Sequence, residues 1–102
     1  MIERHHYLKF KAEYATPEER ETAAARTLEV LPTVPGVLGV TVGVPADDAA
    51  IAPWDLMITV RFPSLAEIEP YRAHPDHRRF VDEFLAPRVE VKKNWNFEAR
   101  TV

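Results

Sequence analysis

The chain has 102 residues, of which 46% are hydrophobic and 28% are charged, and its formal net charge is −3. These values are typical of one globular domain over residues 1–102, and the acidic balance disfavours nucleic acid as a partner. The chain has no cysteine, no apolar run of the roughly 18 residues that a membrane span needs and no apolar signal core, so we expect a cytoplasmic protein without disulfide bonds.

Residues 2–12 alternate between two faces, which predicts a strand with one buried face. That face carries Ile2, Arg4, His6, Leu8 and Phe10. Arg4 and His6 are polar side chains on an otherwise apolar face. Two interpretations stay open: either they lie at the edge of the sheet and reach water or a carboxylate, or they line a pocket.

A helix is predicted from Thr16 to about Leu31. Thr16 and Glu19 have the spacing of a capping box, and Pro17 suits the first turn. The face expected to pack on the sheet is small and apolar: Ala24, Leu28 and Leu31. So many alanines either let the helix lie close to the sheet or leave room for a ligand, and the pattern does not separate these alternatives.

Two further strands are predicted over residues 37–44 and 54–62, joined by a polar, proline-bounded loop over 45–53. The 54–62 strand has the clearest alternation in the chain. Its inward face is expected to carry Trp54, Leu56, Ile58, Val60 and Phe62.

A second helical segment begins with a predicted capping box at Ser64. Helical spacing follows through Leu65, Ile68 and Tyr71. His74 and Pro75 should break the helix, because a residue before proline avoids the α conformation. In the helix that restarts near Pro75, His77 shares a face with phenylalanines and points toward the core, whereas His74 lies before the helix and caps it.

The last strand is predicted over residues 88–97, with Trp95 at a core position. The element order β-α-β-β-α-β, with a broken second helix, predicts a ferredoxin-like α+β domain with a four-stranded antiparallel sheet and helices on one face. The other sheet face is expected to be polar and to carry Lys9, Asp55, Thr59, Arg61, Lys92 and Asn94. Such polarity is typical of a solvated face.

Several strings resemble the stress-responsive dimeric α/β barrel (Dabb) family over essentially the whole chain: LKFK at 8–11, PGV at 35–37, WDLMITVRF at 54–62 and above all YRAHPDHRRFV at 71–81. Members of this family are similar ferredoxin-like domains that pair sheet to sheet, so that two chains close one barrel. The resemblance implies a homodimer. Because the second sheet face is polar, we expect the interface to be partly polar and wet.

One plant member of this family, an olivetolic acid cyclase, closes a polyketide ring by an aldol step without a metal or an organic cofactor. Its working tyrosine and histidine match Tyr71 and His77, and His74 matches the first histidine of the same motif. Two departures argue against the same substrate. Arg4 stands where the cyclase has a pocket histidine, and small residues such as Ala24 stand where its first helix sends large side chains into the pocket.

We therefore expect a small apolar pocket between sheet and helices, with Tyr71 and His77 as candidate catalytic residues. The candidate substrate-binding residues are Arg4, His6, Leu8, Ala24, Leu28, Ile58 and His74. An imidazole beside a phenol in such a pocket can take a proton from an activated carbon while the phenol hydrogen-bonds a carbonyl. The alternative is that both rings are core side chains bonded to the backbone.

Three functions stay open: a cofactor-independent cyclase or related lyase, a non-catalytic stress-related protein that binds a small molecule, and a structural dimer. A cofactor-free monooxygenase is disfavoured because both tryptophans have core positions. No metal site is predicted, since Pro75 breaks the helix that would align His74 with His77 and no third ligand has a definite position. An RNA-binding module of this fold needs exposed sheet aromatics, and only Tyr7 is expected there.

Overall fold

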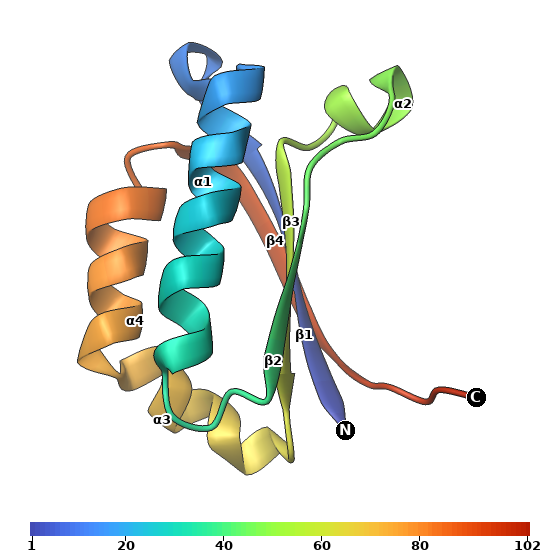
Figure 1. Cartoon of the computed structure of the whole chain (residues 1–102), viewed down its shortest axis with the longest axis vertical. Helices are drawn as coiled ribbons and strands as arrows, with labels where there is room; N and C mark the ends of the chain where they lie inside the picture. The colour runs from blue at the N-terminus through green and yellow to red at the C-terminus, as the bar shows by residue number, and fades with distance from the viewer.

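The computed structural model describes all 102 residues as a four-stranded antiparallel sheet with helices on one face (Figure 1). The strands are β1 (Ile2–Phe10), β2 (Gly39–Gly43), β3 (Leu56–Phe62) and β4 (Val89–Glu98). Their order in the sheet is β2-β3-β1-β4, which confirms the predicted ferredoxin-like architecture. Because β1 lies between β3 and β4, Arg4 and His6 do not lie at the edge of the sheet.

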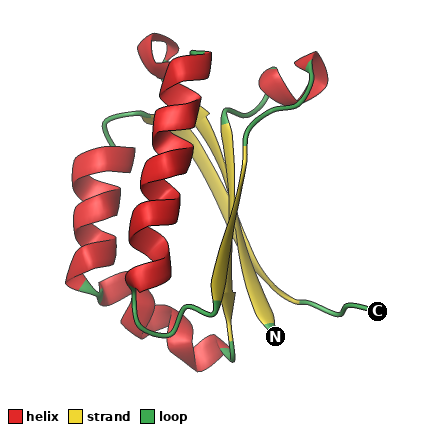
Figure 2. Ribbon diagram, in the orientation of Figure 1, coloured by secondary structure: helices red, strands yellow, loops and turns green.

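The helices are α1 (Pro17–Val30), α2 (Asp48–Ile51), α3 (Ile68–Ala73) and α4 (Pro75–Arg79), and a π-helical turn over Phe80–Leu85 extends α4. Helices α1, α3 and α4 cover one face of the sheet, and the other face, called here the open sheet face, has no helical cover (Figure 2). The segment predicted as a loop contains α2, one turn capped by the side chain of Asp47. No helix has both the length and the apolar character needed to cross a membrane.

Local sequence signals fix most of the helix boundaries. The Thr16 hydroxyl accepts a hydrogen bond from the Glu19 N–H at 3.2 Å, as predicted. The capping box predicted at Ser64 is wrong, because the chain opens there with a 3-10 turn in which the backbone carbonyl of Ser64 accepts the Glu67 N–H. The break at His74 is confirmed: its backbone is extended (φ −61°, ψ 136°), and its Nδ1 accepts the N–H of Asp76.

The buried core lies between the sheet and the helical layer. Its largest fully buried hydrophobic side chains are Tyr71, Phe10, Phe62, Leu8, Leu56 and Ile58. The inner face of α1 differs from the prediction at Leu28, which is 50% exposed, whereas Ala23 and Thr27 are buried. Leu31 is buried and Ala24 packs against the core, as predicted. The Thr27 hydroxyl donates to the carbonyl of Ala23 at 2.7 Å, so this polar side chain can be buried without an unpaired group.

A β-bulge reverses the predicted faces of β4. Phe10 pairs with Val89 on the helix side and Lys9 pairs with Val91 on the open sheet face, so β4 carries one extra residue between them. The alternation beyond this point is shifted by one. Lys92, Asn94 and Asn96 therefore lie on the same side as His6 and Arg4, and Trp95 and Phe97 lie on the open sheet face with His5.

Two other predicted positions are wrong near the start of β3. The ring of Trp54 packs on Tyr7, with 5.6 Å between centroids, and is not in the core. Asp55, expected on a solvated face, is fully buried at the end of the sheet. Its carboxylate accepts the N–H of Phe10 at 2.8 Å and Nε of Arg20 at 2.9 Å. The carboxylate thus takes a backbone donor next to the bulge.

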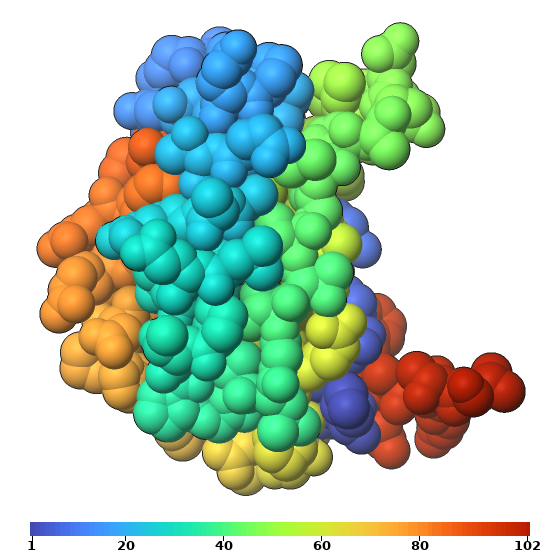
Figure 3. Space-filling view, viewed as in Figure 1, coloured from blue at the N-terminus to red at the C-terminus, as the bar shows by residue number.

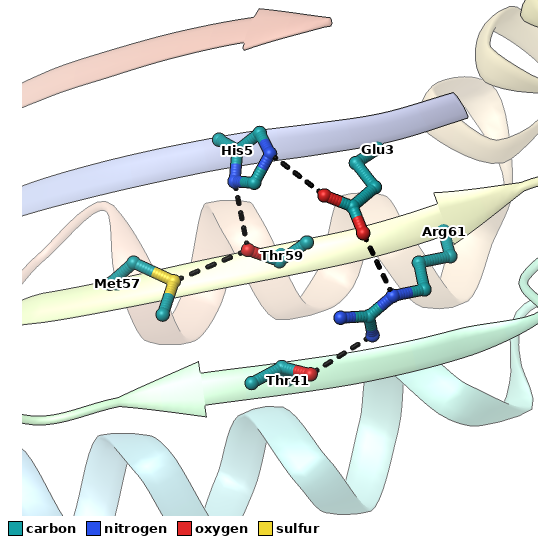
Figure 4. A network of polar contacts seen from close by, with 6 residues as sticks. All are labelled: Glu3, His5, Thr41, Met57, Thr59 and Arg61. Carbon is teal, nitrogen blue, oxygen red and sulfur yellow. Dashed lines mark hydrogen bonds and ion pairs between the residues drawn. The ribbon is translucent and has the colours of Figure 1, made fainter. Parts of the chain in front are cut away.

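The open sheet face has a polar half and an aromatic half. In the polar half, Arg61 donates to Glu3 and Thr41, and His5 lies between Glu3 and Thr59 (Figure 4). The aromatic half carries Tyr7, Trp54, Trp95 and Phe97. Exposed aromatic side chains on this face are therefore more numerous than the sequence predicted.

Candidate functional site

A cavity of about 310 Å³ lies between the sheet and the helices, and residues from both α3 and α4 line it. Its apolar wall consists of Leu8, Leu31, Ile58, Phe80, Val81, Leu85, Ala86 and Val89. The polar side chains Arg4, His6, Tyr71 and His77 line the same space. The volume is at the lower end of the range of roughly 300–1,000 Å³ found for ligand pockets.

Tyr71 and His77 reach this cavity from either side of the helix break. Their ring centroids lie 4.4 Å apart with an angle of 54° between the planes, and Tyr71 also contacts the edge of Phe62. His77 Nδ1 lies 3.0 Å from the carbonyl oxygen of Arg72. Because a carbonyl only accepts, Nδ1 donates its proton and Nε2 is the unprotonated nitrogen of the neutral ring.

Burial sets the protonation states of the Tyr71 phenol and of the two imidazoles in the cavity. Burial lowers the pKa of His77 to about 4, against a hydrogen bond to the Arg72 carbonyl that raises it. Burial, followed by the charges of Arg4 and Lys92, lowers the pKa of His6 to about 3. Burial raises the pKa of Tyr71 well above its ordinary value. At neutral pH the cavity thus offers a phenol that can donate and imidazoles that can accept a proton.

Arg4 brings an uncompensated positive charge to the cavity. Its terminal nitrogens donate to the side-chain oxygens of Asn96 at 2.9 Å and Asn94 at 3.1 Å, and its Nε is buried without a partner. Burial, and then the nearby charge of Arg72, lowers the pKa of Arg4. Because its partners are neutral amides, the guanidinium is free to stabilise negative charge on a bound molecule.

Six of the predicted site residues line the cavity: Arg4, His6, Leu8, Ile58, Tyr71 and His77. Ala24 and Leu28 do not, because α1 turns Ala23 toward the core and leaves Leu28 exposed. His74 does not line it either, since its side chain caps α4. Lys92 and Asn94 also line the cavity but are not among the predicted site residues. Their position depends on the bulge in β4, for which the sequence has no recognisable signal.

The two histidines of the HPDH string, His74 and His77, contact different groups. His74 Nδ1 lies 3.9 Å from a carboxylate oxygen of Asp76, whereas His77 Nδ1 contacts a backbone carbonyl. No group of three or more His, Cys, Asp or Glu side chains comes together in a way that could hold a metal ion.

We expect the free energy of unfolding to decrease as the pH falls from about 6.5 toward 4. His6 and His77 have folded-state pKa values of about 3 and about 4, below the ordinary value of 6.5, so the unfolded chain binds more protons in this window. Each imidazole removes up to ~1.4 kcal/mol of stability per pH unit. Urea unfolding across this pH range measures the loss, and NMR titration of the two rings identifies its source. Rings that titrate near their ordinary pKa would contradict the prediction.

Solved structures with the same fold include proteins of differing description. A Dabb family protein with a ferredoxin-like fold from Mesorhizobium loti is 19% identical, with a TM-score of 0.79 and coverage of 98% of this chain and 97% of that chain. A dimeric ferredoxin-like protein of unknown function from Thermobifida fusca is 20% identical (TM-score 0.78, coverage 96% and 90%). A hydroxynitrile lyase from Passiflora edulis is 14% identical (TM-score 0.78, coverage 99% and 94%).

At these identities the structural likeness shows the fold alone. A search of curated proteins found no match. The family model of the Stress responsive A/B Barrel Domain (Dabb), in contrast, matches residues 2–95, which is nearly the whole chain. The matched range includes every residue that lines the cavity. The resemblance seen in the sequence is confirmed, and the chain belongs to the stress-responsive A/B barrel (Dabb) family.

Proposed function

We propose that the chain binds a small carbonyl compound in the cavity and moves a proton on it without a cofactor, as a cyclase or a related lyase. One observation carries this proposal. The phenol of Tyr71 and the imidazole of His77 lie with ring centroids 4.4 Å apart and line one cavity, where the first is protonated and the second is neutral. This pairing provides a donor and a base at the same place.

The chemistry would proceed as an internal aldol addition. His77 takes a proton from a carbon beside one carbonyl, while the Tyr71 hydroxyl stabilises the negative oxygen of the enolate. The enolate carbon then forms a bond to a second carbonyl carbon of the same molecule. The resulting alkoxide takes the proton back from His77, so the step needs no other reactant.

The low pKa of His77 makes it a weak base before the reaction begins. Negative charge that develops on the substrate oxygen favours the charged imidazolium beside it, and this raises the pKa as the proton moves. The Passiflora edulis lyase supports the proposal, because its name shows that a protein of this fold can act as a lyase. Other proteins of this fold are described as antibiotic biosynthesis monooxygenases, but Trp54 and Trp95, the residue types expected at such a site, do not line the cavity.

Heptane-2,6-dione tests the proposal, because its internal aldol closure and loss of water give a cyclic enone that absorbs in the ultraviolet. We expect the protein to accelerate enone formation above the buffer rate, and exchange of the protons beside the carbonyls into D2O to be accelerated with it. Binding in the cavity without acceleration of either process would favour the alternative, a non-catalytic binding protein.

A cytoplasmic location and a single domain over residues 1–102 stay predictions.

We also propose that two chains pair through the open sheet face. Trp95 is 50% exposed and Phe97 is 56% exposed on this face. The face is flanked by α2 at one end and by the C-terminal residues at the other, which extend from the body of the molecule (Figure 3). The dimeric Thermobifida fusca protein supports this proposal. Pairing through this face would bring its polar half into the interface, and the partly polar character of the interface stays a prediction.

The Trp95→Glu variant is expected to shift the protein from dimer to monomer, because a charge would replace a large apolar contact at the interface. Sedimentation velocity at matched concentrations measures the shift. Leu28→Glu is the matched control, since Leu28 is also 50% exposed but lies on the helical layer. A dimer that persists in the Trp95 variant would exclude this face as the interface.

A further inference from the structure

We infer that the natural ligand of the cavity is an organic anion whose carboxylate is held by Arg4 and Lys92. This inference rests on the proposed binding function and names its class of ligand. The whole chain has a net charge of −3, yet every charged residue that lines the cavity is a cation: Arg4, Arg72, Arg78 and Lys92. The cavity is a positive site in a negative protein.

Two of these four cations are already neutralised at the surface. Arg72 pairs with Glu69 at 2.8 Å, and Arg78 pairs with Asp82. Both carboxylates are largely exposed and lie outside the cavity. Arg4 and Lys92 make no ion pair with any residue of the chain, so the uncompensated charge of the cavity comes from two neighbouring strands, β1 and β4.

The surroundings of Arg4 orient its guanidinium without cancelling its charge. Asn94 and Asn96 occupy the terminal nitrogens with neutral oxygens, and the buried Nε has no acceptor. A buried N–H group without a partner is costly and rare in folded proteins. A carboxylate in the cavity would supply the missing acceptor and the opposite charge together.

The remainder of the cavity defines the other end of the ligand. Leu8, Ile58, Phe80 and Val81 form an apolar wall beside the polar group. An inorganic anion would leave this wall without a contact, whereas a small carboxylic acid with a hydrocarbon or aromatic body would cover it. Burial near positive charges lowers the pKa of His6 and His77, so both rings are uncharged at neutral pH and can lie against such a body.

Benzoate and benzamide test the inference, because they have nearly the same shape and differ in charge. We expect benzoate to shift the NMR signals of cavity residues with an affinity at least about tenfold higher than that of benzamide, since hydrogen bonds to a charged group are the stronger kind. Lys92→Gln should weaken benzoate binding about threefold or more and leave benzamide binding unchanged.

Lys93→Gln is the matched control, because it removes the same charge from the adjacent residue, which pairs with Tyr7 on the open sheet face. Arg4→Gln should abolish the preference for benzoate, with circular dichroism as the check that it folds. Equal affinity for the two compounds, or equal effects of the two lysine variants, would overturn the inference that the ligand is an anion. Neither result would contradict the proposal that the cavity binds a small molecule. Absence of cavity shifts with both compounds would also overturn the inferred ligand class, whereas the proposed function fails only if the protein does not act on heptane-2,6-dione.

Discussion

The Asp55→Ala variant is expected to lose about 3–5 kcal/mol of unfolding free energy, which is the usual cost of removing one partner of a buried ion pair. The Asp55 carboxylate is fully buried and is contacted by Arg20 at 2.9 Å, by Lys9 at 3.5 Å and by the N–H of Phe10 at 2.8 Å. Alanine would leave the Arg20 charge, only 12% exposed, without its partner. It would also leave the Phe10 N–H without an acceptor at the bulge.

Urea unfolding at neutral pH measures this loss, and Asp82→Ala is its control. Asp82 also pairs with an arginine, Arg78, but its side chain is 58% exposed, so its removal should cost less than about 1 kcal/mol. Asp55→Asn keeps an acceptor for the Phe10 N–H and should lie between the two. Similar losses in the Asp55 and Asp82 alanine variants would show that the buried contacts of Asp55 contribute no more to the free energy of unfolding than an exposed ion pair does.

Asp55 also shows where alternation stops being a guide to burial. The period of two places Leu56 and Ile58 in the core correctly, because these residues lie within a regular ladder. The residue just before that ladder is not held by it. Its side chain turns into the structure because a positive partner on α1, Arg20, and a free N–H on β1 are both there, and neither is adjacent in sequence.

The same distinction explains the outcome for the candidate site. Tyr71 and His77 are separated by a proline break that is encoded locally, and the structure brings both to the cavity as expected. Alternation along the sequence assigns Lys92 and Asn94 to the wrong face, because a bulge of one residue on β4 depends on how this strand pairs with β1. Of the two unpaired cations that line the cavity, the sequence therefore predicts Arg4 but not Lys92.

The sequence pattern also fails to predict which side chain of α1, Thr27 or Leu28, is buried. Leu28 is more apolar than Thr27 and Glu29 beside it, so a pattern of hydrophobicity selects Leu28 for the inner face. The structure instead buries Thr27, whose hydroxyl bonds within the helix, and exposes Leu28. A threonine that satisfies its own hydroxyl can therefore replace a leucine at a close helix–sheet contact.

The His77→Ala variant is expected to slow proton exchange and enone formation at least ~100-fold, which is the usual contribution of a positioned general base. Tyr71→Phe keeps the aromatic contact with Phe62 and removes only the hydroxyl, and we expect a loss of about 10²–10³-fold because one donor to the enolate oxygen is missing. Initial rates with heptane-2,6-dione measure both losses. Circular dichroism checks that the variants fold.

His74→Ala separates loss of the base from loss of helix structure. His74 belongs to the same string but caps α4 outside the cavity, so its removal should cost about 1 kcal/mol of stability and leave the rate of the folded protein nearly unchanged. The wild-type rate should be independent of pH near neutrality and fall as the pH approaches 4, where His77 becomes protonated. Equal rate losses in the two histidine variants would show that the His77 ring is not the base. A rate that falls already near pH 6.5 would show instead that the pKa of the catalytic imidazole is not lowered by burial.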